Sequence, residues 1–189
     1  METGNGEAAV SKKRTFVQHE KKGLQIKDIL LISILLASGA VLKLFVPNMG
    51  GMKPNFIIAM YCLTILLIKP RLLEAAIIGL LAGAISQILP AQPFINFASE
   101  LTGAIAMCLL IRIPMEKIKI PVKPTICTFF STLVSGFTFI GIMYLLYFIR
   151  DDVRPAALTL FLGVVFGTAT INAIIVQVLY IPLKLALKK

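Results

Sequence analysis

The fold is decided by long uncharged stretches, and residues 122–149 give the plainest example: VKPTICTFFSTLVSGFTFIGIMYLLYFI. After Lys123 this stretch carries no charged side chain. A run of ~18 or more apolar residues predicts a helix that crosses the bilayer, because about 20 helical residues match the ~30 Å thickness of the hydrocarbon core. We therefore predict a transmembrane helix at this place.

Five further runs of the same kind occur in the chain of 189 residues, 58% of which are hydrophobic. They are residues 29–46, 55–68, 72–89, 98–113 and 156–187. The run 55–68 is short for a full crossing, so we expect it to start within the outer interface, to tilt little, or to be shielded by other helices. The predicted fold class is all-α: a polytopic membrane protein, in which residues 28–189 form a compact bundle of six transmembrane helices. Residues 1–27 are polar and are predicted to be a disordered cytoplasmic tail.

The charge distribution predicts the orientation. Most lysines and arginines fall in segments on the same side as the N-terminal tail, whereas the opposite loops carry only Lys53, Arg150 and Arg154. Cytoplasmic loops are enriched in these residues, so we predict that both termini lie in the cytoplasm. The net charge of +10 is thus a topology signal, and it predicts contact with membrane lipid and no binding of nucleic acid.

The sequence offers no catalytic or metal-binding pattern. Its one histidine, His19, lies in the polar tail, and the cysteines Cys62, Cys108 and Cys127 lie separately in apolar runs. Neither a Ser-His-Asp or Cys-His centre nor a zinc site can be assembled from this set at these spacings. We predict that the protein is not an enzyme and needs no cofactor or metal.

Glu100 is the one acidic residue inside a predicted span that asks for an explanation. Ionisable side chains within the membrane are costly and are by default functional hypotheses. Under that reading Glu100 binds a substrate ammonium group and Lys53 binds the carboxylate, or Glu100 holds Lys53 or Lys43 in place. The alternative is a carboxylate at the outer N-terminus of its helix, where the helix dipole favours it. Lys43 is expected to extend to the outer interface by snorkelling.

Other polar and aromatic residues are predicted at the same outer level. Amide side chains there would supply neutral hydrogen bonds, and aromatic rings would supply a stacking surface. The full predicted substrate-binding set is Lys53, Asn55, Gln87, Phe94, Asn96, Glu100 and Tyr144. Asn172 and Gln177 are predicted to lie deeper, nearer the cytoplasm, and to make interhelical hydrogen bonds.

Small residues recur at helix-packing spacing. Gly79-x-x-x-Gly83 and Gly163-x-x-x-Gly167 are GxxxG patterns, which let helix backbones approach closely in lipid. They serve either packing within the bundle or contact with another membrane protein, and the spacing does not distinguish the two.

The stretch 46–55, VPNMGGMKPN, followed by a short helix ending LLIKPR at Arg71, resembles the TrpP family, as does GLLAGAIS at 79–86. That family comprises tryptophan-specific S components, the substrate-binding subunits of energy-coupling factor (ECF) transporters. The resemblance implies a six-helix protein of the bacterial plasma membrane that captures tryptophan from outside. It also implies that loop one, with Gly50 and Gly51, acts as the gate.

The resemblance further implies partners. S components associate with a transmembrane T component and two cytoplasmic ATPases, and small residues on the first helix make the T-component contact. Ser33-x-x-x-Ala37 stands at that place here, with serine where the family's pattern often has alanine. The alternatives are an S component for another aromatic or vitamin substrate and a membrane scaffold protein that transports nothing.

Overall fold

The computed structural model describes residues 23–45, 55–88, 94–114, 122–149 and 157–187. The regular structure of these residues consists of six helices, as the sequence predicts. They are α1 (Ile26–Phe45), α2 (Ile57–Ile68), α3 (Leu72–Ser86), α4 (Ile95–Leu110), α5 (Lys123–Ile149) and α6 (Leu158–Ala186). Each lies within a few residues of a predicted run. Most of the predicted tail and the loop 46–54 fall outside the described residues.

The outside of the bundle is apolar. Large side chains such as Phe45, Leu73, Phe148 and Val178 are exposed on α1, α3, α5 and α6. Among the described helices, α1, α5 and α6 are long and apolar enough to cross a membrane. So much exposed apolar surface is typical of a protein surrounded by lipid. Fold and composition together define a helical membrane protein.

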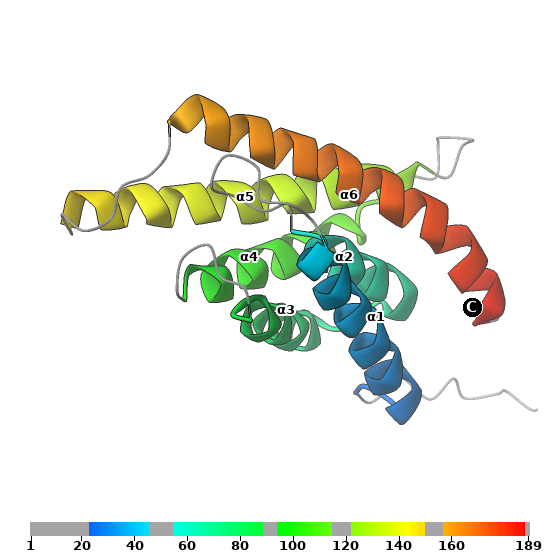
Figure 1. Cartoon of the computed structure of the whole chain (residues 1–189). Helices are drawn as coiled ribbons and strands as arrows, with labels where there is room; N and C mark the ends of the chain where they lie inside the picture. The colour runs from blue at the N-terminus through cyan, green and yellow to red at the C-terminus, as the bar shows by residue number, and fades with distance from the viewer. Residues whose placement is uncertain (1–22, 46–54, 89–93, 115–121, 150–156, 188–189) are drawn as a thin grey trace, which may run out of the picture.

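Helix α2 is the centre of the bundle, where it contacts all five other helices (Figure 1). Every residue from Ile57 to Ile68 is buried. At 1.5 Å per residue the helix is about 18 Å long, well short of the ~30 Å hydrocarbon core. Of the three explanations that the sequence left open for this short run, shielding by other helices is the one that the structure supports.

The end of α2 is set by backbone geometry. Lys69 adopts a left-handed conformation, with φ of 52°, and its N–H donates to the carbonyl oxygen of Ile65 at 2.9 Å. Pro70 follows, and it cannot continue a helix because it lacks a backbone donor. The chain therefore turns directly into α3.

The two GxxxG patterns have different surroundings. A Cβ atom on Gly79 would lie 2.8 Å from the Cβ of Ala104, and one on Gly83 would lie 2.8 Å from the Cα of Phe97. These glycines therefore permit the close packing of α3 against α4. Cβ atoms on Gly163 and Gly167 would meet no described atom within 4 Å. The pattern on α6 is thus not used for packing among the described helices.

The predicted contact residues on α1, Ser33 and Ala37, are both exposed. The Ser33 hydroxyl donates to the carbonyl oxygen of Ile29 in its own helix at 3.0 Å. This bond satisfies the hydroxyl group and leaves a small, smooth surface on α1. That a partner helix covers it remains a prediction.

A buried polar cluster around Glu100

Glu100 is the centre of a polar cluster enclosed by helices. It lies in the second turn of α4 and is only 1% exposed. The side-chain amide of Asn55 donates to its Oε1 atom, and the hydroxyl of Ser135 donates to Oε2 at 3.3 Å. Asn55 precedes α2 and Ser135 belongs to α5, so three segments distant in sequence meet at one carboxylate.

This cluster lies deep in the bundle rather than at its edge. Ser135 is about 18 Å from the first residue of α5 and about 21 Å from the last, at 1.5 Å per residue. Glu100 lies in the second turn of α4, so its position near the start of this helix agrees with the helix-dipole interpretation and its burial agrees with the functional one. Helix α5 extends about 13 Å further past this level than α4 does, because α4 begins only five residues before Glu100.

Lys43 is the second charged member of the cluster. It is 6% exposed, and its ammonium group donates to the carbonyl oxygen of Ser86 at 3.2 Å. Its charge also interacts with the Glu100 carboxylate. The expectation that Lys43 snorkels to the interface is therefore wrong. Buried charges are tolerated when an opposite charge and hydrogen bonds compensate them, and both are provided here.

Asn172 joins the cluster from α6. Its side-chain N–H₂ donates to the backbone carbonyl of Asn55 at 3.2 Å, while Asn55 Oδ1 accepts the N–H of Ile57 at 3.3 Å. Asn172 lies at the middle of α6, and this bond joins it to the residues before α2. The predicted interhelical bond is confirmed for Gln177, whose side-chain oxygen accepts the hydroxyl of Thr125 on α5 at 2.7 Å. The Oδ1 atom of Asn172 is buried and has no hydrogen-bond partner in the described part of the chain.

Tyr61 contributes a buried hydroxyl group from α2. The group lies within reach of Glu100, Ser131 and Ser135, which surround it with polar atoms. A Cβ atom on Gly103 would overlap it and would lie 2.9 Å from the Cβ of Ser135. Glycine at this position therefore lets α2, α4 and α5 approach one another around the carboxylate.

The other predicted binding residues make different contacts. The side chain of Gln87 donates to the carbonyl oxygen of Gly83 at 3.3 Å and accepts the N–H of Phe94 at 3.2 Å, which ties the end of α3 to the start of α4. Phe94 itself is 75% exposed and stacks on Phe97, with ring centroids 6.5 Å apart. Neither side chain contacts Glu100 in this arrangement.

Asn96 and Tyr144 lie on the side of the cluster toward the start of α4 and the end of α5. Asn96 is buried on α4, one turn before Glu100 and on the same face. Tyr144 packs edge-on against Phe161, with centroids 6.5 Å apart, about 13 Å beyond Ser135 along α5. Lys53, Gly50 and Gly51 lie outside the described residues.

The structure thus brings Asn55 and Glu100 of the predicted set together, with Lys43 as a charged partner of Glu100 that the sequence had offered. Tyr61 and Ser135 were not predicted. Lys43 had a usable signal, since a lysine within an apolar run is unusual. Tyr61 and Ser135 had none, because tyrosine and serine are common in membrane helices. Within the described ranges no three histidine, cysteine or acidic side chains lie close enough to hold a metal ion.

The fold and the site define a class: a helical membrane protein that encloses a charged, hydrogen-bonding cluster between its helices. Comparison with known proteins shows which family within this class the chain matches. The family model described as "Tryptophan transporter TrpP" matches residues 25–188, and the chain belongs to this family.

Two curated relatives carry the same name, "Probable tryptophan transport protein". The one from Clostridium acetobutylicum is 28% identical over 169 residues, which cover 87% of this chain and 96% of that protein. The one from Bacillus subtilis strain 168 is 25% identical over 160 residues, which cover 83% of this chain and 90% of that protein. No solved structure matches the chain.

Proposed function

We propose that this protein binds tryptophan and mediates its uptake across the plasma membrane of a bacterium. It would cross the membrane several times with both termini in the cytoplasm, as the distribution of lysine and arginine favours. Membership of the tryptophan transporter family and the names of its relatives support the substrate.

One observation carries the assignment of the site. A buried carboxylate and a buried ammonium group, Glu100 and Lys43, share a cluster with the buried hydroxyl of Tyr61 and with Asn172 Oδ1, a buried polar atom that has no described partner. Leaving a buried polar atom without a hydrogen bond costs ~1–3 kcal/mol. A ligand that supplies the missing bond would recover that free energy. Tryptophan is a zwitterion with one additional donor, the indole N–H, and its groups complement this set.

Each residue has a proposed role. Glu100 accepts hydrogen bonds from the substrate ammonium, and Asn55 holds the carboxylate in place. Lys53 or Lys43 binds the substrate carboxylate. Asn172 Oδ1 accepts the indole N–H. Because these groups are buried, a ligand that lacks the matching atoms leaves them unpaired and binds weakly.

The residues nearer the outer end act earlier in this scheme. Phe94 and Tyr144 offer aromatic surface on which the indole ring stacks as it enters, and Gln87 and Asn96 offer hydrogen bonds there. Gly50 and Gly51 lie in the loop proposed to close over the ligand, because adjacent glycines permit backbone conformations that other residues rarely adopt.

The energy for transport would come from an ECF module. In this scheme a T component contacts the small, exposed surface at Ser33 and Ala37 on α1, and its ATPases drive the cycle. An S component for another aromatic or vitamin substrate is the alternative. A scaffold without a ligand is less well supported, since it gives no reason for a charged cluster inside the bundle.

The test uses the absence of tryptophan from the chain. The purified, detergent-solubilised protein is titrated with L-tryptophan and excited where tyrosine barely absorbs, so that fluorescence reports the ligand alone. We expect a saturable spectral shift that tryptophan analogues compete and vitamins do not. A folded protein that gives no shift would refute tryptophan binding.

A further inference from the structure

A second polar site lies at the other end of the bundle, among the helix ends remote from Asn55. It is a pocket of about 480 Å³ whose lining includes four basic residues, Lys69, Arg71, Arg112 and Lys123. They come from the end of α2, the start of α3, the residues after α4 and the start of α5. Among the described residues, no acidic residue lines the pocket. Four positive charges at one set of helix ends predict an anionic ligand.

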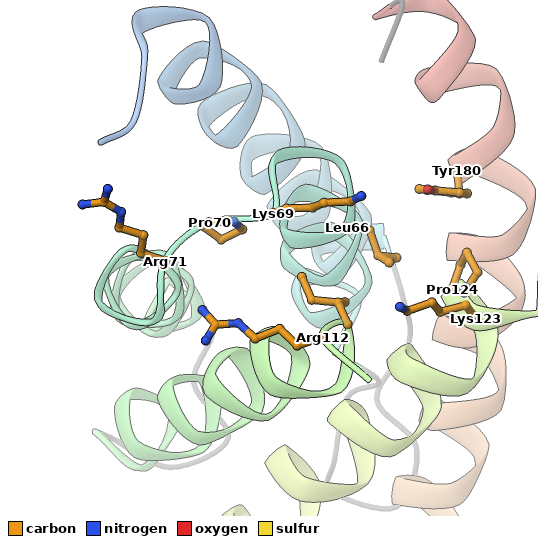
Figure 2. A pocket seen from close by; sticks show the side chains of 9 residues that line it. Leu66, Lys69, Pro70, Arg71, Arg112, Lys123, Pro124 and Tyr180 are labelled. Carbon is orange, nitrogen blue, oxygen red and sulfur yellow. The ribbon is translucent and has the colours of Figure 1, made fainter. Parts of the chain in front are cut away.

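The lysines, rather than the arginines, reach into this space. In Figure 2 the ammonium groups of Lys69 and Lys123 lie on the side of the pocket near Leu66, while the guanidinium groups of Arg71 and Arg112 point away from them. Glu74, in the first turn of α3, accepts the backbone N–H of Arg71 at 2.8 Å and places a negative charge on that side. The positive charge that faces the pocket is therefore mainly that of the two lysines.

Lys123 is already oriented by the fold. It is half-buried, and its ammonium group donates to the carbonyl oxygen of Ile113 at 2.9 Å. That acceptor is neutral, so the charge of Lys123 is not compensated by this bond. An ammonium group carries three donors, which leaves two for a ligand. An anion would thus meet a positioned donor.

The rest of the pocket is apolar, and this restricts the chemical class of ligand that the pocket can bind. Leu66 and Ile111 line it beside the ring of Tyr180. Ile113 and Ile181, each next in sequence to a lining residue, are exposed apolar side chains beside the pocket. Basic residues bind an anionic group, and the apolar residues beside them contact an apolar one. A ligand that fits both is amphiphilic, with a phosphate at its polar end. Basic pockets between membrane helices are known binding places for anionic lipid headgroups.

We propose that this pocket binds the phosphodiester headgroup of an anionic phospholipid, with Lys69 and Lys123 contacting the phosphate oxygens. The acyl chains then lie along the apolar surfaces of α4 and α6. Bound in this way, the lipid joins helix ends from α2, α4, α5 and α6. The proposal does not depend on tryptophan binding, because the two sites lie at opposite ends of α2.

The test measures lipid binding to the purified full-length protein by native mass spectrometry. Phosphatidylglycerol is expected to bind more tightly than zwitterionic phosphatidylcholine. Lys69→Gln and Lys123→Gln are each expected to weaken phosphatidylglycerol binding about five-fold, which corresponds to ~1 kcal/mol for one basic residue near a lipid surface. The double variant should lose roughly 25-fold. Replacing both lysines by arginine keeps the charges and should keep binding.

Lys27→Gln is the matched control, since Lys27 is exposed on α1 and does not line the pocket. Thermal unfolding, followed by circular dichroism, checks that each variant is folded. Equal binding of the two lipids to the unaltered protein would overturn the proposal without any variant. The proposal would also be overturned if Lys27→Gln reduced the affinity for phosphatidylglycerol as much as Lys69→Gln does. Full displacement of phosphatidylglycerol by millimolar inorganic phosphate would assign the pocket to a soluble anion instead.

Discussion

Replacing Glu100 by glutamine removes a charge from the centre of the proposed tryptophan site with little change of shape. Glutamine keeps one oxygen that can accept the Asn55 amide or the Ser135 hydroxyl. What the variant loses is the negative charge opposite a substrate ammonium group. The substitution therefore tests the electrostatic role of Glu100 rather than its packing.

The expected magnitude follows from burial. Glu100 is 1% exposed, so water does not screen its interaction with a bound cation. A hydrogen bond to a charged group contributes ~1.5–3 kcal/mol, which corresponds to a factor of roughly 10 to 150 in Kd. L-tryptophan should lose affinity within that range. Indole has no ammonium group, so its affinity should change less than about three-fold.

Fluorescence titration measures both ligands directly, because the chain itself contains no tryptophan. Glu74→Gln serves as the control, since it removes the same charge from the first turn of α3, at the opposite end of the bundle. It should leave both affinities unchanged. Equal losses for L-tryptophan and indole in Glu100→Gln would refute the ammonium role and would point to a general disturbance of the site.

The remaining predictions concern stability, measured by thermal unfolding in detergent. Gly103→Ala should destabilise the protein by about 1–3 kcal/mol, because the new methyl group would overlap a buried hydroxyl, and Gly79→Ala should do the same between α3 and α4. Gly141→Ala, where a Cβ meets nothing within 4 Å, should be neutral or stabilising and would contradict this reasoning if it destabilised equally. Lys43→Met should cost ~3–5 kcal/mol by leaving the Glu100 charge unpaired, and adding Glu100→Gln should restore part of that loss. A double variant as unstable as the sum of the two single variants would show that these charges are not coupled.

The prediction of the helices succeeded because the signal is local. Residues 122–149 must form a helix in lipid whatever they pack against, since every backbone polar group has to be satisfied within the segment. The helix ends followed from prolines such as Pro70 for the same local reason. Asn55 and Glu100 stood out in the sequence because charged and amide groups are rare in apolar runs, and their role in substrate binding stays a prediction.

The failures concern depth and partners. Lys43 was predicted at the interface because a lysine near a helix end usually reaches water. The sequence left Glu100 open between a binding role and a helix-end role, because sequence position gives distance from a loop and not depth in the bundle. Phe94 and Gln87 contact Phe97 and Gly83, which the sequence did not show, and their role in substrate binding stays a prediction.

By itself, the sequence determined that this chain forms apolar helices with basic residues gathered on one side, because hydrophobicity and charge act residue by residue. Only the tertiary structure decided that the short α2 is the buried centre of the bundle and that Lys43, Asn55, Glu100 and Asn172 meet around its start. The physical reason is that such contacts depend on how far each helix extends past its neighbours. Offsets of that kind arise from packing among all six helices.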